Sequence, residues 1–256
     1  ASATMRGDNW TVGWLIDRVD VVDPDFPDSS VKFSRQPQLT GAWSHYGEKW
    51  DLFADGDITQ FSRDSGAPLS EGKRFSADLK AEYPLSASYG ALKPSVLLFP
   101  RWSEAMRDGS TQSDQYVTTG ASLDGSLYFE KLTIEGVLHE LIPRAKLLVR
   151  EPNKDPTIEK FDTPNTENDI DTVGQIFLDN PISGGDFVGD TREVALSLTS
   201  RGINNKGIET YRVTAGRTVY LADRDITLSD TPETTDQGPL VVESAVRLAE
   251  SLRWNM

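Results

Sequence analysis

The 256-residue chain contains no cysteine and only two histidines. Without cysteine, disulfide bonds and thiolate metal sites are excluded within this sequence. Long hydrophobic runs are missing too. No stretch approaches the roughly 18 apolar residues that a membrane-spanning helix needs, so a helical membrane protein is excluded. Positive charge is scarce, because 26 lysine and arginine residues stand against 40 acidic residues and give a formal net charge of −14. We expect no nucleic-acid partner, since a negative field repels phosphate backbones.

Motifs for catalysis or metal binding are missing as well. His45 lies in a predicted turn and His139 on an apolar strand face, and neither has a second ligand at a metal-binding spacing. The segments 55–57 and 168–171 resemble fragments of calcium loops, but they lack the glycine and the closing glutamate of the full pattern. No Gly-x-Ser-x-Gly nucleophile elbow is present. The sequence therefore predicts no enzyme activity, no metal and no cofactor.

The two ends of the sequence favour an internal piece of a longer protein. The first residues, Ala1–Thr4, have neither the basic nor the apolar region of a secretion signal. The last residues, Arg253–Met256, stop inside an alternating run.

What the chain does contain is a regular alternation of apolar and polar residues, clearest between residues 117 and 130. The apolar side carries Val117, Thr119, Ala121, Leu123, Leu127 and Phe129. The polar side carries Thr118, Ser122, Asp124, Ser126, Tyr128 and Glu130. A period of two predicts a β-strand with one apolar and one polar face.

Ten segments of this kind are predicted as antiparallel strands. They cover residues 9–21, 31–44, 49–61, 73–85, 90–101, 116–130, 135–150, 190–201, 208–221 and 240–254. Short connections at 45–48, 86–89, 131–134 and 202–207 alternate with longer ones at 22–30, 62–72, 102–115, 151–189 and 222–239. Short periplasmic turns and long extracellular loops are typical of an outer-membrane β-barrel. The strands are also much longer than the roughly five or six residues of an ordinary sheet. A soluble β-sandwich, which would bury the same apolar stripes, is the alternative.

Two features of the predicted strands bear on how the wall would sit in a membrane. Tryptophan near the predicted strand ends suits an interfacial girdle, and it occurs at Trp10, Trp43, Trp50, Trp102 and Trp254. Arg217 is the exception on the apolar side of its strand. Because a charge at the membrane midplane would cost about 2–4 kcal/mol, we expect Arg217 at the rim, or a β-bulge that shifts the register.

The predicted inward positions carry charges of both signs. They include Asp51, Asp55, Asp57, Asp78, Lys80, Glu82, Asp124, Glu140, Arg144, Lys146, Glu193 and Arg212. A porin for anionic sugars should have a mainly basic lumen. The mixed signs instead favour a hydrophilic wall packed against a partner and water.

The connection at 151–189 is unusual because it is long and not uniformly polar. A structureless loop of this length is uncommon unless it is functional or disordered. Its apolar residues are Phe161, Val173, Ile176, Phe177, Leu178, Ile182, Phe187 and Val188. These side chains need a place to be buried, either inside the lumen, against another protein or within the loop itself.

The same region carries a family resemblance. Residues 140–156, Phe161-Asp162, 174–180, 183–190 and 196–201 together resemble a strand-and-loop signature of the LptD family, which assembles LPS at the outer membrane and is also called the organic solvent tolerance family. Residues 36–39 and 213–221 add to the resemblance, and the order of the motifs holds from about Trp10 to Trp254.

The resemblance implies a fold and a function. Proteins of this family have a periplasmic jellyroll followed by a large closed barrel, and the LptE lipoprotein sits inside that barrel as a plug. LPS leaves through a lateral gate into the outer leaflet. The present chain would be a partial barrel domain, residues 1–256, with an extracellular loop at 151–189. The jellyroll, the family's cysteines and the terminal strands have no counterpart.

From the resemblance we expect a protein of the Gram-negative outer membrane. The expected partners are LPS, the outer membrane, an LptE-type plug and the rest of the LptD chain. The loop residues predicted to contact the plug are Phe161, Asp162, Phe177, Asp179, Asn180, Gly184, Asp186 and Phe187. Two other functions stay open from the residues alone, a substrate-specific outer-membrane porin and a secreted β-sandwich that binds glycans.

Overall fold

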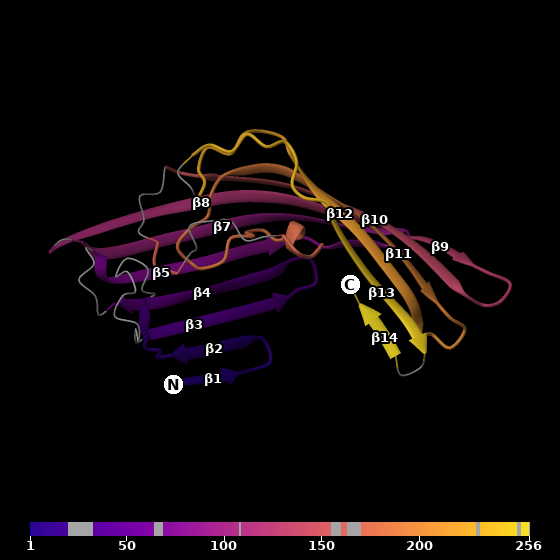
Figure 1. Cartoon of the computed structure of the whole chain (residues 1–256), viewed down its shortest axis with the longest axis horizontal. Helices are drawn as coiled ribbons and strands as arrows, with labels where there is room; N and C mark the ends of the chain where they lie inside the picture. Colours follow the sequence, from indigo (N-terminus) through magenta and orange to yellow (C-terminus); the bar gives the residue numbers. More distant parts are fainter. Residues whose placement is uncertain are drawn as a thin grey trace, which may run out of the picture.

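The computed structural model describes residues 1–19, 33–63, 69–107, 109–154, 160–162, 170–228, 231–249 and 252–255. These residues form one antiparallel sheet of fourteen strands (Figure 1). The longer strands are β3 (Ser34–Tyr46), β4 (Asp51–Ser62), β5 (Leu69–Glu82), β7 (Gly90–Arg107), β8 (Ser110–Leu127), β10 (Leu138–Pro152), β11 (Thr191–Ile203), β12 (Glu209–Tyr220) and β13 (Val241–Ala249). The shorter elements are β1 (Ser2–Arg6), β2 (Trp10–Leu15), β6 (Leu85–Ala87), β9 (Phe129–Leu132), β14 (Leu252–Asn255) and a 3₁₀ turn η2 (Gln175–Phe177). Within the described part of the chain, no helix is long and apolar enough to cross a membrane.

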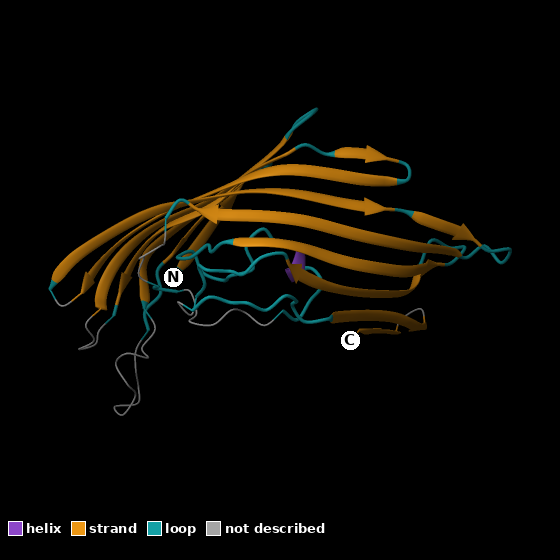
Figure 2. Cartoon of the chain, turned by 90° about the horizontal axis from the view of Figure 1, so that it is seen from above, coloured by secondary structure: helices purple, strands orange, loops and turns teal. Residues whose placement is uncertain are grey.

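The sheet is a meander in which strands pair in chain order. The order is β1-β2-β3-β4-β5-β7-β8-β10-β11-β12-β13-β14, while β6 pairs with β7 and β9 with β10. Seen from above, the sheet curves into a trough, and loops lie on its concave side (Figure 2). The sheet is not closed: in the described residues β1 pairs only with β2, and β14 only with β13. The expected class, a segment of an antiparallel barrel wall, is confirmed.

Nine of the ten predicted strands are present, and β1, β6 and β9 are additional. The predicted strand 240–254 is wrong, because β13 and β14 divide it into an antiparallel hairpin. The prediction of a long connection at 102–115 is wrong. β7 and β8 stay paired from Trp102↔Gln115 to Arg107↔Ser110 and meet in a turn where Gly109 has a φ of +76°. Serine, threonine and aspartate dominate the far end of this hairpin, and their composition resembles that of a loop. Composition alone cannot distinguish a loop from a strand that is rich in polar residues.

The alternation of residues sorts the side chains onto two faces as predicted. In β5, Phe75 and Leu79 are exposed on the convex face, whereas Ser76 and Glu82 are buried on the concave face. The convex face continues across the sheet with exposed Val12, Leu39, Ile58, Val96, Leu98, Leu123, Leu147, Leu196, Leu198, Val213 and Val242. Trp10, Trp43, Trp50 and Trp254 are exposed at or near strand ends. Trp102 instead lies within β7, because that strand runs on to Arg107.

Arg217 lies on the convex face without a bulge. It pairs with Leu196, and the only register shift between β11 and β12 falls at Gly202/Ile203. Of the two expected alternatives, the bulge is therefore excluded and the position near the rim remains. β12 ends at Tyr220, so Arg217 lies close to the loop end of its strand. Its Nε donates to the Gly238 carbonyl (3.0 Å) and its Nη1 donates to Gln237 Oε1 (2.6 Å).

Two glycines of the convex face give a matched test of this strand packing. A Cβ at Gly56 would lie 2.3 Å from the Ser76 carbonyl oxygen, whereas a Cβ at Gly41 would meet nothing within 4 Å. Gly56→Val should therefore reduce the free energy of unfolding by about 1–3 kcal/mol through overpacking. Gly41→Val should change it by no more than about 0.5 kcal/mol. Urea unfolding of the detergent-refolded barrel measures both, and equal effects would contradict the packing described.

Candidate partner interface on the inner face

The described part of the 151–189 connection folds back onto the concave face of the sheet (Figure 2). We call its residues 160–162 and 170–190 the inner loop. Three apolar clusters join it to the wall. Phe161 packs with Phe61 and Ala105, and Val188 packs with Leu97, Phe99 and Leu148. Val173, Ile176 and Phe177 pack with Ala195 and Val241. The inner loop therefore reaches from β4 to β13, and most of its apolar side chains are buried within this chain.

The first cluster is a close aromatic contact that depends on a glycine. The rings of Phe161 and Phe61 stack with centroids 4.5 Å apart, and Phe33 meets Phe161 edge-on at 5.4 Å. A Cβ at Gly72 would come within 2.1 Å of the Phe161 ring, so glycine is needed at this position of β5. The aromatic pair fixes one end of the inner loop against β4 and β5.

Arg74 of β5 holds both ends of the inner loop. Its side chain is 2% exposed. Nη1 donates to Asp186 Oδ1 (2.7 Å) and to Asp162, while Nη2 donates to Asp57 Oδ2 of the neighbouring strand (2.9 Å). Asp186 is fully buried and also accepts the backbone N–H groups of Phe161 and Asp162, both at 2.9 Å. Burial raises the pKa of the Asp186 carboxyl above its usual value, and the Arg74 guanidinium opposes that rise.

A second charged cluster fixes the middle of the inner loop. Lys146 Nζ donates to the Phe177 carbonyl and to Asp179 Oδ1, both at 2.7 Å. Lys80 Nζ lies 3.2 Å from Asp179 Oδ2. Arg150 Nη1 donates to the Asp179 carbonyl (2.6 Å) and to Asn180 Oδ1 (3.2 Å). Burial alone would raise the pKa of Asp179, but the Lys146 and Lys80 ammonium groups outweigh it and hold the pKa below its usual value.

Hydroxyl groups of β8 also bind the loop backbone. The Val188 N–H donates to Tyr116 Oη (2.8 Å), and Tyr116 donates to the Asp186 carbonyl (3.2 Å). Thr118 Oγ1 donates to the Val188 carbonyl (3.0 Å). The wall thus supplies hydrogen-bond partners for buried loop backbone that would otherwise cost free energy.

The structure places all eight predicted contact residues in the inner loop on the concave face. Phe161, Phe177, Asp186 and Phe187 are buried; Asp162, Asp179 and Asn180 are half-buried; Gly184 is exposed. The buried residues attach the loop to its own wall, and contact with a partner protein stays a prediction. Leu178, in contrast, is 47% exposed beside the buried Phe177.

Sequence reasoning missed the wall residues that hold the loop, chiefly Arg74, Tyr116 and Arg150. Strand alternation could have found Arg74, because it shares a face with Ser76 and Asp78. No sequence signal could have paired it with Asp162 and Asp186, which lie 88 and 112 residues away.

Two of the candidate metal ligands, Asp57 of the segment 55–57 and His139, instead lie within hydrogen-bond distance of neighbouring side chains. Asp57 accepts hydrogen bonds from Thr59, Ser76 and Arg74. His139 Nδ1 lies 3.0 Å from Tyr211 Oη. In the part of the chain that the structure describes, no group of three or more histidine, aspartate or glutamate side chains is placed to hold a metal ion. Of the segment 168–171, residues 168 and 169 lie outside the described residues.

A meander of long strands, apolar on the convex face and polar on the concave face, defines a wall segment of a membrane β-barrel. The family model described as LPS transport system D matches residues 1–256, and the chain belongs to this LptD family. It is 25% identical over 88% of its length to the LPS-assembly protein LptD of Pseudomonas fluorescens. It is 28% identical over 99% of its length to that of Alcanivorax borkumensis, and 25% identical over 98% to that of Xylella fastidiosa. The chain spans 29%, 33% and 35% of these relatives, respectively.

Removing Arg74 tests the attachment of the inner loop. Arg74→Met should destabilise the docked loop by about 3–5 kcal/mol, because it leaves carboxylates buried without their cation. Limited proteolysis within 170–190 should become much faster. Lys73→Met is the matched control, since Lys73 is the next residue and its side chain is 56% exposed. If both variants are cleaved at the rate of the unmodified protein, Arg74 does not hold the loop.

Acid should release the middle of the inner loop. The folded pKa of Asp179 lies below its unfolded value of about 3.9, so the carboxylate contributes stability above that value and loses it as the pH falls through the folded pKa. The protection of the amides 176–180 against hydrogen exchange, measured relative to the intrinsic rate at each pH, should therefore fall below about pH 4. Asp179→Asn should show fast exchange already at neutral pH, with a weaker acid dependence. An unchanged profile in this variant would contradict the assignment.

Proposed function

We propose that this chain forms part of the wall of a barrel that assembles LPS in the outer membrane of a Gram-negative bacterium, without catalysing a reaction. The observation that carries the proposal is membership of the LptD family over residues 1–256, together with relatives named as LPS-assembly proteins. The unpaired strand edges at β1 and β14 support a further binding partner for this chain. Since a membrane sheet needs every backbone group paired, these edges would pair with the rest of the LptD chain.

The inner loop supports a second partner, an LptE-type plug lipoprotein inside the barrel. Its buried phenylalanines and the buried Asp186 give it a fixed shape, and a preorganised surface binds at lower entropic cost. Leu178 offers an exposed apolar group on this otherwise polar side. The plug would contact Leu178, Gly184 and the half-buried Asp162, Asp179 and Asn180. Phe161, Phe177, Asp186 and Phe187 would hold that surface in place.

Two alternative functions fit less well. A substrate-specific porin needs an open channel, yet the inner loop covers the centre of the concave face and the wall charges are largely paired there. A soluble β-sandwich needs a second sheet over the apolar face, and the described residues form one sheet with that face exposed.

Photo-crosslinking in intact cells tests the plug contact. A photoreactive phenylalanine analogue replacing Leu178 should crosslink to a small lipoprotein. The same analogue at Phe177, which is 8% exposed, should react only within the chain. At Leu147, which is 40% exposed on the convex face, it should give no lipoprotein adduct. Adducts of equal yield at Leu147, or none at Leu178, would reject the inner loop as the plug interface.

Depletion tests the assembly function. When expression of the native protein is stopped, newly made LPS should no longer reach the outer leaflet, and expression of the full-length protein should restore delivery. Unchanged LPS delivery after depletion would reject the proposed function.

A further inference from the structure

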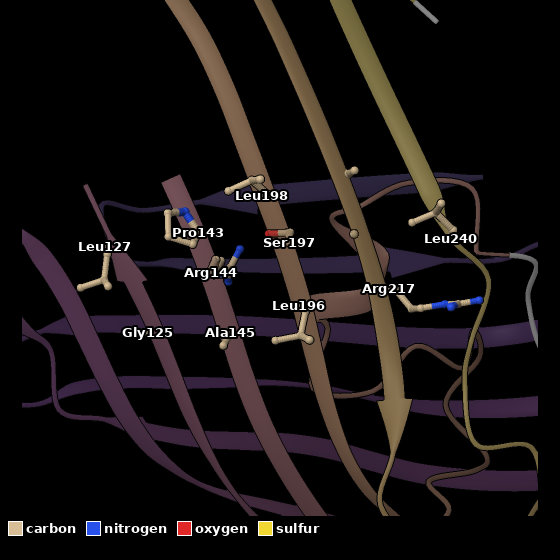
Figure 3. Close-up of a pocket in the computed structure, with 12 residues that line it drawn as sticks. Gly125, Leu127, Pro143, Arg144, Ala145, Leu196, Ser197, Leu198, Arg217 and Leu240 are labelled. Carbon is tan, nitrogen blue, oxygen red and sulfur yellow. The ribbon is translucent and has the colours of Figure 1, made fainter. Parts of the chain in front are cut away.

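A hollow on the convex face combines a mostly apolar lining with two arginines, Arg144 and Arg217. It measures about 460 Å³ and is lined from β8, β10, β11 and β12 and by Leu240, the residue before β13 (Figure 3). Leucine side chains form its walls, namely Leu127, Leu196, Leu198 and Leu240. Small residues, Gly125, Ala145 and Ala215, leave the space between them. The guanidinium of Arg144 is engaged on the concave side, where it binds Asp124 and lies over the Phe177 ring. The charged group available to the hollow is therefore Arg217, whose side chain extends to one side of it in Figure 3.

The hydrogen-bonded register shows how the hollow runs across the wall. Gly125 pairs with Ala145, Ala145 with Leu196, and Leu196 with Arg217. This row begins close to the short-turn end of β8, which ends at Leu127. It finishes close to the loop end of β12, which ends at Tyr220. Because barrel strands tilt by about 35–45°, a row across them climbs from the apolar band towards the rim at the long loops.

Hydrogen bonds orient the Arg217 guanidinium for binding an anion. The bonds from Nε to the Gly238 carbonyl and from Nη1 to Gln237 Oε1 fix the plane of the guanidinium. Among the described residues, Arg217 Nη2 has no hydrogen-bond partner, and the Arg217 side chain is exposed. Arginine binds phosphate with strong charge-assisted hydrogen bonds, and an arginine on a lipid-facing surface is tolerated best at the interface.

An apolar trough that ends at an oriented guanidinium has the chemistry of a phosphorylated lipid, with a chain along the wall and a phosphate at the rim. We propose that this hollow binds lipid A, the acylated and phosphorylated end of LPS, from the outer leaflet. One acyl chain lies between Leu196 and Leu198, and a phosphate contacts Arg217. The apolar part continues the lipid-facing surface of the wall. The choice of lipid A rather than another phospholipid rests on the proposed function.

Native mass spectrometry of the full-length protein in detergent tests the site, with lipid A, phosphatidylglycerol and phosphatidylcholine as probes. Arg217→Gln should weaken lipid A retention roughly tenfold, as expected for one lost bond to a charged group. Arg217→Lys should retain part of the binding. Arg212→Gln is the charge-matched control, because Arg212 lies on the same strand and pairs with Glu209. It should leave retention unchanged.

A second pair of variants tests the apolar part. Ala145→Trp, in β10, should fill the hollow and reduce lipid A retention. The control is Ala121→Trp in β8, which is also on the convex face but outside the hollow and should leave retention unchanged. Retention unchanged in both Arg217→Gln and Ala145→Trp would overturn the site. Phosphatidylglycerol held as tightly as lipid A would overturn the choice of occupant. Neither result bears on LPS delivery, which the depletion experiment measures independently.

Discussion

The buried Arg74 guanidinium is the interaction on which the inner side of this wall depends. It lies between Asp57 of the adjacent strand and Asp162 and Asp186 of the inner loop, which flank the segment 163–185. An unpaired charge buried at such a site would cost several kcal/mol, so the strand and the two loop segments are stable only together. The same interaction positions two of the apolar clusters, because Phe161 directly precedes Asp162 in the sequence and Val188 follows Asp186 by two residues.

This arrangement also explains how a wall with open edges keeps one curvature. The inner loop contacts strands from β4 to β13, through Phe61 at one end and Val241 at the other. Such contacts add long-range constraints to a sheet whose other pairings join only neighbouring strands. The two faces suit different surroundings. The leucines of the convex face suit contact with lipid, whereas protein and water cover the charges of the concave face.

Much of the fold followed from sequence pattern. The period of two places Phe75 and Leu79 on one face and Ser76 and Glu82 on the other, and a one-residue slip would reverse all four. The strand prediction was wrong where it relied on residue composition instead of on alternation. The hairpin around Gly109 has the polar residues of a loop, yet its backbone pairs to the end. For Arg217 the sequence left the rim and a bulge open, and the structure shows an unshifted register close to the strand end, with the guanidinium bonded to the Gly238 carbonyl.

Local sequence pattern predicts most of the strands, their two faces, the family resemblance and the need to bury the apolar residues of the long connection. Alternation and turn chemistry act over a few residues, so they can be read locally. Only the tertiary structure decided where that connection lies and which wall residues hold it. The partners of Arg74 are up to 112 residues away, and they meet because the sheet curves and brings the loop back across β5. Sequence spacing carries no record of that curvature, since it arises from the twist and pairing of the whole sheet.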